Sequence, residues 1–205
     1  MFLKKLNENL IERLSETNLE TAFPFQKKSI SRIKSGGDLI CVSDVNTGKS
    51  TTLIIGIIHQ LKTELNDVPR AIIAVENNKK AEILKEQFDT LGKYNKLRVH
   101  AIYEGANIEN ERDAVYIGAD IVIGTAKRLN QLYFINGINL GDLKILAIDD
   151  AHSIAKQSEL SAYDKLFKSV PKCQKIIFSE KITDRINFYK EEFMMFPEII
   201  ETNNL

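Results

Sequence analysis

The chain has 205 residues, 43% of them hydrophobic, and its 28 Lys and Arg residues are balanced by 28 Asp and Glu residues. This length and hydrophobic content favour one compact domain with a sizeable core. A formal net charge of zero excludes a global field that would draw the chain to nucleic acid or to an acidic membrane, so any nucleic-acid contact must be local.

The predicted elements begin with two helices, from about Leu3 to Leu14 and from about Pro24 to Ile33, which should cap the domain rather than extend its sheet. Six short apolar runs then have the character of buried strands: 38–42, 70–75, 97–102, 120–123, 143–148 and 175–178. Apolar residues recur with helical spacing between these runs, as in 50–65, 78–91, 125–134 and 158–167. This alternation predicts an α/β fold, with a mostly parallel sheet and helices on both faces.

Cysteine content and apolar runs bear on where the protein works. Cys41 and Cys173 form no metal spacing with the three histidines and make a poor disulfide framework, so we expect reduced, intracellular thiols. The N-terminus turns polar too early for a signal peptide, and the longest apolar run, 53–58, is too short to span a bilayer. A soluble cytoplasmic protein with no membrane contact is expected.

A phosphate-loop pattern follows the first predicted strand and leads directly into a helix. Such a loop turns backbone N–H groups and a helix N-terminus toward phosphates, while Lys49 would place a charge on the outer phosphates and Ser50 would ligate magnesium. The predicted nucleotide-binding residues of this segment are Asn46, Thr47, Gly48, Lys49, Ser50 and Thr51. A chance Gly-Lys-Ser in a turn is the alternative.

The loop departs from the general pattern at two positions. Ser43 stands in place of the first glycine, and Asn46 occupies a position where most such loops have glycine. The loop bends through positive φ, and asparagine is among the few other residues that tolerate a left-handed conformation. The departure at Asn46 is therefore compatible with a working loop.

Two carboxylates, Asp149 and Asp150, end the predicted strand 143–148, where a magnesium–ATP site needs them. Asp149 would hold the metal ion through water, and Asp150 would orient the attacking water. Acids that merely end a strand are the alternative.

These motifs, in this order, resemble those of the DEAD-box RNA helicases, and residues 149–152 are similar to the box that names the family. The resemblance implies a three-layer RecA-like domain, with N-terminal helices in 1–36 and the P-loop core in 37–205. It also implies that Gln26, in a Phe-Pro-Phe-Gln segment, reads adenine. Phe2 is a candidate for the aromatic that packs on the base.

Residues 118–129 resemble the family segment in which a strand runs into a Thr-Pro-Gly-Arg motif. The resemblance implies that Thr125 and Arg128, with the loop around Gly105, grip the backbone of single-stranded RNA. Thr125 could do so through its hydroxyl and a helix-start N–H group. An ordinary helix N-cap is the alternative for Thr125.

Three departures from the family qualify these expectations. Residues 76–81 match the family's Pro-Thr-Arg-Glu-Leu-Ala motif only at Ala81, and only Ser179 survives of its Ser-Ala-Thr motif. Asp150 is one methylene shorter than the family's usual glutamate, and a misplacement near 1 Å can cost on the order of 10²-fold in rate. Slow hydrolysis is expected.

The family's motor has two RecA-like domains, and the sequence shows motifs of the first only. We therefore expect binding of ATP or ADP with Mg²⁺, weak ATPase activity and weak, sequence-independent binding of single-stranded RNA. Unwinding would need a protein partner that supplies the second domain. Two alternatives stay open: a catalytically degenerate pseudo-helicase acting as an interaction module, and a P-loop ATPase of another family in which Gln26 has no role.

Overall fold

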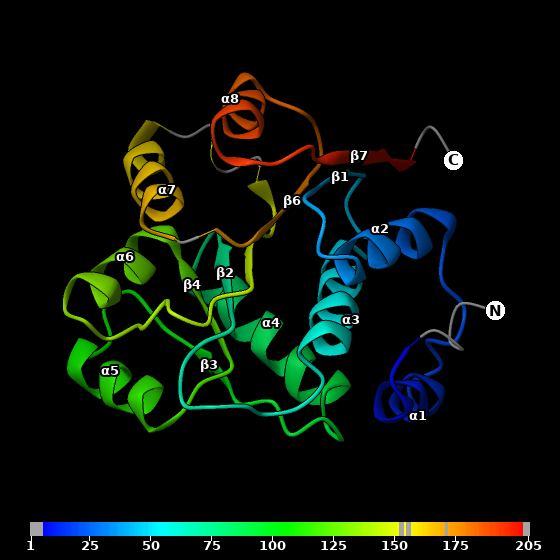
Figure 1. Cartoon of the computed structure of the whole chain (residues 1–205), viewed down its shortest axis with the longest axis horizontal. Coiled ribbons are helices and arrows are strands. Elements are labelled where there is room, and N and C mark those ends of the chain that lie inside the picture. The colour runs from blue at the N-terminus through cyan, green and yellow to red at the C-terminus, as the bar shows by residue number, and fades with distance from the viewer. Residues whose placement is uncertain (1–5, 152–153, 155–156, 171, 203–205) are drawn as a thin grey trace.

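The structure is a computed structural model that describes residues 6–151, 154, 157–170 and 172–202. It consists of one seven-stranded sheet with helices on both faces (Figure 1). The helices are α1 (Glu8–Glu16), α2 (Pro24–Lys34), α3 (Lys49–Leu61), α4 (Asn78–Leu91), α5 (Ile108–Ile117), α6 (Ala126–Phe134), α7 (Gln157–Ser169) and α8 (Asp184–Phe193). The strands are β1 (Leu39–Val42), β2 (Ala71–Val75), β3 (Val99–Ala101), β4 (Ile121–Thr125), β5 (Ile145–Ile148), β6 (Gln174–Ser179) and β7 (Glu198–Glu201).

All seven strands are parallel, in the order β3-β4-β2-β5-β6-β1-β7, which confirms the predicted α/β class. The six predicted strands are all present. The seventh, β7, pairs with β1 at the sheet edge and was not predicted, because its four residues begin and end with glutamate. Helices α5 and α8 were not named from the sequence either.

Two helix boundaries differ by four or more residues from the sequence prediction, for local reasons. Helix α1 begins at Glu8 rather than near Leu3, because the side chain of Asn7 accepts a hydrogen bond from the N–H of Leu10 and caps the helix there. Helix α3 ends at Leu61, four residues early. Its last carbonyl accepts a hydrogen bond from the guanidinium of Arg70, and Lys62 then takes a left-handed φ of 68°.

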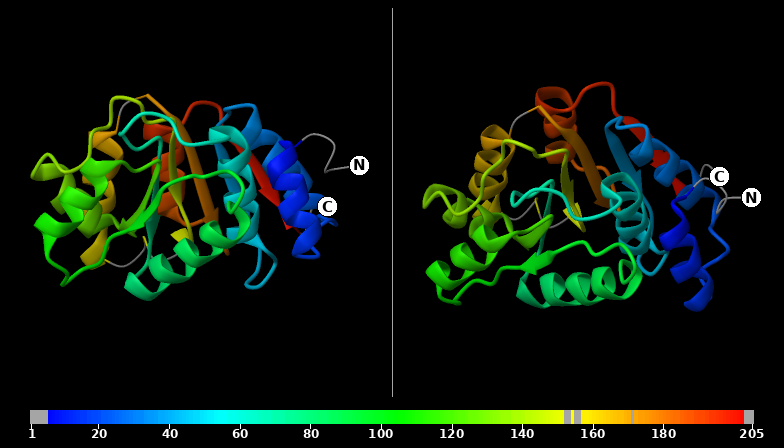
Figure 2. Two further views of the ribbon diagram at one scale, coloured as in Figure 1. Left: turned by 90° about the horizontal axis from the view of Figure 1, so that it is seen from below. Right: turned by 60° about the horizontal axis from the view of Figure 1, so that its bottom comes forward.

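Successive apolar side chains of the five inner strands enter different cores, as a parallel sheet covered on both faces requires. In β2, Ile73 packs in the core beneath α1–α4, whereas its neighbours Ile72 and Ala74 pack in the core beneath α5–α8. Full burial of one such isoleucine stabilises the fold by about 1.5–3 kcal/mol. Figures 1 and 2 show these two helical layers on opposite sides of the sheet.

The N-terminal helices pack against the helices on one face of the sheet and add no strand to it, as predicted. Helix α2 packs along α3, and α1 contacts α3 and α4. This arrangement places the start of α2 beside the loop that connects β1 to α3. None of the helices in the described part of the chain is long and apolar enough to cross a membrane.

Candidate functional site

The loop between β1 and α3 turns through two left-handed residues. Asn46 has φ of 60° and Gly48 has φ of 86°, so the predicted left-handed conformation at Asn46 is confirmed. The hydroxyl of Thr47 lies 2.8 Å from the hydroxyl of Ser43 and donates a hydrogen bond to the carbonyl of Asp44. The loop therefore folds back on itself and ends at the N-terminus of α3.

Lys49 is the first residue of α3, and its side chain lies buried inside this loop. Its ammonium donates hydrogen bonds of 2.7 Å to the carbonyls of Ser43 and Asp44. These bonds hold a positive charge beside the N-terminus of α3, where backbone N–H groups point outward. The arrangement can bind phosphate groups, as the sequence predicts. Thr51, in the same first turn of α3, lines a cavity beside this loop together with Lys49.

Asp149 lies at the carboxyl end of β5 and is fully buried. Its Oδ2 accepts a hydrogen bond of 2.8 Å from the hydroxyl of Ser50, while its Oδ1 is buried with no hydrogen-bond partner among the described residues. Burial, and then the charge of Asp150, raise the pKa of Asp149 above its ordinary value. A buried carboxylate with a free oxygen beside a serine hydroxyl fits a hard cation such as Mg²⁺, which Ser50 and Asp149 would hold.

Asp150 turns away from the strand in a left-handed conformation, with φ of 59°. Its Oδ2 lies 2.7 Å from the ammonium of Lys80, which also lies 3.8 Å from Oδ2 of Asp149. Burial lowers the pKa of Lys80, but the hydrogen bond to Asp150 and the charges of both aspartates outweigh it, so the pKa lies above its ordinary value. The raised pKa keeps Lys80 cationic at neutral pH, close to Asp150 and within 3.8 Å of Asp149.

A cavity of about 380 Å³, which we call the phosphate cavity, extends from the phosphate loop to Lys80 and Asp150. It is lined by Val45, Asn46, Gly48, Lys49, Ser50, Thr51, Lys80, Gln87, Asp150 and Glu180. Glu180 lies directly after β6, the strand between β1 and β5, and adds a second carboxylate to the cavity wall, beside Asp150. The predicted loop residues and acids are thus brought together by the sheet, whereas His152 lies outside the described residues.

A second cavity, of about 480 Å³, shares Asn46 with the first and is also lined by Thr47. Its remaining lining residues are Phe23, Pro24, Phe25 and Thr202. Gln26 lies next to it in the first turn of α2, where Oε1 accepts from the N–H of Phe23 and Nε2 lies 3.4 Å from the carbonyl of Gly48. Gln26 thus links α2 to the phosphate loop. Phe2 lies outside the described residues.

The three predicted RNA-contacting residues lie close together where β3 and the adjacent strand β4 end. The hydroxyl of Thr125 caps α6 by accepting the N–H of Arg128, and it donates to Glu104 at 2.7 Å. The buried guanidinium of Arg128 donates to the carbonyl of Ala106 at 2.6 Å. Both contacts flank Gly105, which has φ of 89° and open space around it.

Two carboxylates, those of Glu104 and Glu111, pair with the polar side chains around Gly105. Glu111 accepts a hydrogen bond of 2.8 Å from Arg128, and Glu104 lies 3.3 Å from the ammonium of Lys127. The hydrogen bond from Thr125 lowers the pKa of Glu104 below its ordinary value, although burial opposes it. Thr125 is therefore both an N-cap and a partner of an ionised carboxylate, and Arg128 is part of an internal ion pair.

Residues 23–180 match the DEAD/DEAH box helicase family. The chain belongs to this family. It is 27% identical over 197 residues to the ATP-dependent RNA helicase CshA of Listeria monocytogenes, covering 95% of this chain and 38% of that protein. It is 24% identical over 202 residues to the ATP-dependent RNA helicase RhlB of Pseudoalteromonas atlantica, covering 96% of this chain and 48% of that protein.

A solved structure of a DEAD box protein from the hyperthermophile Methanococcus jannaschii superposes with a TM-score of 0.89 at 22% identity. The match covers 96% of this chain and 54% of that one, and it shows a shared fold. The chain spans less than half the length of the two curated helicases it matches.

Sequence reasoning missed three charged residues of this DEAD-box site: Lys80, Glu104 and Glu180. Lys80 and Glu180 lie in segments identified only as departures from family motifs. One signal could have found all three, because each lies within five residues after the end of a strand, and such residues lie at the carboxyl edge of a parallel sheet. Their partners, however, could not be read from the chain.

Proposed function

We propose that these 205 residues are the ATP-binding domain of a DEAD-box RNA helicase, which binds ATP or ADP with Mg²⁺ and hydrolyses ATP slowly. The observation that carries the proposal is the hydrogen bond from Ser50 to Asp149, with the buried ammonium of Lys49 in the same loop. A phosphate-binding helix start and a carboxylate are thereby joined in one site. Magnesium held there would neutralise charge that develops on the transferred phosphoryl group.

Gln26 and the cavity beside Phe23 support an adenine site next to these phosphate contacts. In this proposal the base lies against the start of α2, and the phosphates reach past Thr47 to Lys49. Both cavities include Asn46, so a single ligand could extend along the loop.

Slow turnover is proposed on two grounds. Asp150, the candidate for orienting water, is short and already engages Lys80. By the family resemblance a second motor domain would supply arginines to the γ-phosphate, and such a residue is typically worth about 10³ to 10⁵ in rate. Unwinding is accordingly proposed to need that second domain, supplied from outside these 205 residues.

Weak binding of single-stranded RNA is the further part of the proposal, through phosphate and sugar contacts near Thr125 and Gly105. The helicases named above are ATP-dependent RNA helicases, which supports an RNA role for this chain. Because these contacts would be to the backbone, affinity should fall steeply with salt and should not depend on base sequence.

A pseudo-helicase is the second candidate, and the ion pair between Lys80 and Asp150 favours it, because it occupies the carboxylate that hydrolysis would use. ATP hydrolysis measured with and without single-stranded RNA separates the two. Turnover above a Lys49→Ala background supports the enzyme, whereas nucleotide binding without turnover supports the pseudo-helicase.

Calorimetry with ATP and Mg²⁺ tests the main claim directly. Lys49→Ala should lower ATP affinity at least about fivefold, since a buried charge that contacts phosphate is lost. The exposed Lys28, on α2, provides a control, because Lys28→Ala should leave affinity unchanged. Equal affinities for all three proteins would contradict nucleotide binding at this loop.

A further inference from the structure

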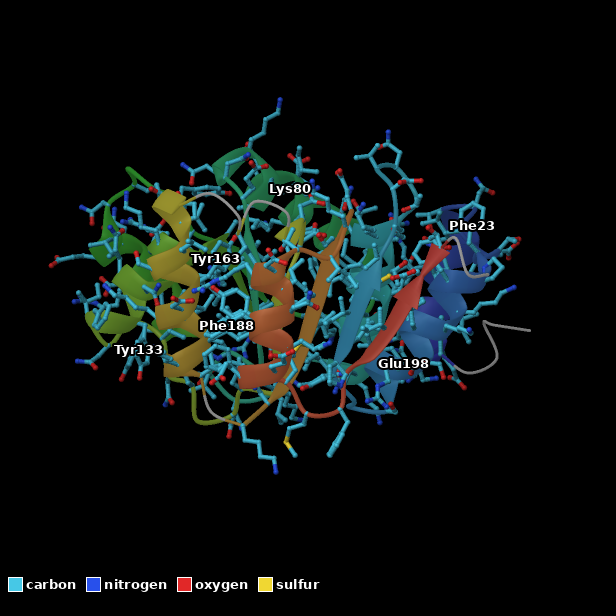
Figure 3. The ribbon with its side chains drawn as sticks, turned by 90° about the horizontal axis from the view of Figure 1, so that it is seen from above. Phe23, Lys80, Tyr133, Tyr163, Phe188 and Glu198 are labelled. Atoms are coloured by element: carbon cyan, nitrogen blue, oxygen red, sulfur yellow. The ribbon has the colours of Figure 1, made fainter. Side chains whose placement is uncertain are left out.

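Lys80 lies in the first turn of α4, the helix that follows β2. It reaches Asp149 and Asp150, here the acidic box, at the end of the neighbouring strand β5. Its ammonium is 2.7 Å from Asp150 and 3.8 Å from Asp149, and its side chain is 30% exposed. Figure 3 places Lys80 and Phe23 at the same edge of the molecule, and the arrow of β7 points to that edge from Glu198.

The start of α4 is held firmly, so the position of Lys80 is fixed by the fold. The side chain of Asn77 accepts a hydrogen bond of 2.9 Å from the N–H of Lys80. Asn78 exchanges two hydrogen bonds of 2.9 Å with the backbone of Glu104. Lys79, one residue earlier, is exposed instead.

A lysine in the first turn of a helix is electrostatically unfavourable, because the helix N-terminus carries partial positive charge. The first turn of α4 contains no acidic residue to offset it. The carboxylates of Asp149 and Asp150, at the end of the neighbouring strand β5, provide the negative charge that offsets it. Lys80 is therefore placed by tertiary contacts, and it lies on the wall of the phosphate cavity.

We propose that Lys80 is a built-in cation of the acidic box, which competes with divalent metal for Asp149 and Asp150 and makes nucleotide binding less dependent on metal. The claim about nucleotide binding, the nucleotide part, rests on the proposed function. The claim that Lys80 competes with metal, the metal part, concerns the nucleotide-free chain alone.

Charge explains both halves of the proposal. Without metal, phosphates in the cavity would face the charges of Asp149 and Asp150, and the ammonium of Lys80 offsets one of them. With metal, a divalent ion must share Asp149 with the ammonium of Lys80, which already lies 3.8 Å from Oδ2 of Asp149. The ion therefore adds less to nucleotide affinity than it would without the lysine. Removal of the lysine charge should therefore raise metal affinity and increase metal dependence.

Binding of Mn²⁺ to the nucleotide-free chain, followed by electron paramagnetic resonance, tests the metal part. Lys80→Met keeps most of the side-chain length without the charge and should bind Mn²⁺ about three- to tenfold tighter than the parent, as expected for loss of one partly exposed charge. Lys79→Met, its neighbour on the same helix, should match the parent. Equal binding by parent and Lys80→Met, or no binding by either, would overturn the proposal.

Calorimetry with ATP tests the nucleotide part, as the ratio of the Kd in EDTA to the Kd in excess Mg²⁺. This ratio should be about three- to tenfold larger for Lys80→Met than for the parent or Lys79→Met. An unchanged ratio would contradict the inference. If none of the proteins binds ATP, the proposed function fails, while the Mn²⁺ measurement still decides the role of Lys80.

Thermal melts check that each variant is folded. Lys80→Gln serves as a second uncharged variant. Both variants must shift Mn²⁺ affinity in the same direction, since they share only the loss of charge. Opposite shifts would assign the effect to packing and overturn the proposal.

Discussion

The hydroxyl of Ser50 donates a hydrogen bond of 2.8 Å to Oδ2 of Asp149, 99 positions later in the chain. The two residues belong to α3 and to the segment after β5, and β6 separates β5 from β1 in the sheet. Parallel strands end at one edge, so both segments meet there. This contact joins the phosphate loop to the acidic box.

Gln26→Ala should reduce the preference for ATP over GTP, because the proposed adenine contact would be lost. Parallel titrations of ATP and GTP measure the two affinities. Gln87→Ala is the matched control, since the exposed Gln87 lines the phosphate cavity and should affect both nucleotides alike. An unchanged preference in Gln26→Ala would favour a P-loop ATPase of another family.

Asp150→Glu should raise the single-turnover hydrolysis rate and leave ATP affinity nearly unchanged, since the longer carboxylate brings the base closer to water. Asp150→Asn should abolish what remains. The left-handed backbone at position 150 suits aspartate and asparagine better than glutamate, so thermal melts should accompany the kinetics.

The outcome of this series separates the two candidate functions. Equally inert proteins would favour the pseudo-helicase. A glutamate variant slower than the parent would show that Asp150 is already fitted to its site.

Glu104→Gln should strengthen binding of single-stranded RNA, because it removes a negative charge beside Thr125 and frees the ammonium of Lys127. A gain of about two- to fivefold at low salt is expected for loss of one partly exposed charge, and the gain should shrink as salt rises. Fluorescence anisotropy with an unstructured RNA measures it. Glu109→Gln, at an exposed position nearby, controls for the change in net charge. Equal gains in RNA affinity for Glu104→Gln and Glu109→Gln would indicate no local role for Glu104.

Asp120→Asn should destabilise the fold by about 3 kcal/mol, because it breaks a buried ion pair. Asp120 is fully buried and accepts hydrogen bonds from Arg70 at 2.5 Å and from Nε and the backbone N–H of Arg98 at 3.0 Å. Urea unfolding of both proteins at neutral pH measures the difference. Asp67→Asn removes an exposed partner of Arg98 and should cost much less.

The same variant should change how stability depends on pH. Burial raises the pKa of Asp120, but the hydrogen bonds from Arg98 and Arg70 outweigh it, so the folded-state pKa lies below the ordinary value. The carboxylate therefore stabilises the fold above pH of about 4, and this contribution is lost as pH falls toward the folded-state pKa. Asp120→Asn should show a shallower loss of stability in that range. Parallel acid profiles would contradict the assignment.

Local sequence patterns predicted most of the fold. Alternating apolar runs and helical spacing identified six of seven strands, and α4 has the predicted bounds of Asn78 and Leu91. The edge strand β7 was missed because half-exposed edge strands need little apolar sequence. Asn46 in the phosphate loop was correctly predicted to be left-handed, because that preference is local to one residue.

The sequence by itself determined the family, the phosphate loop and the acidic strand end, because each is a contiguous segment whose chemistry depends on its own spacing. Only the tertiary structure decided which charges meet. The order of strands brings Lys80 to Asp150 and Glu111 to Arg128, and no local pattern encodes that order. Partners across a sheet depend on how whole elements pack, and this is why the cation at the acidic box emerged only from the fold.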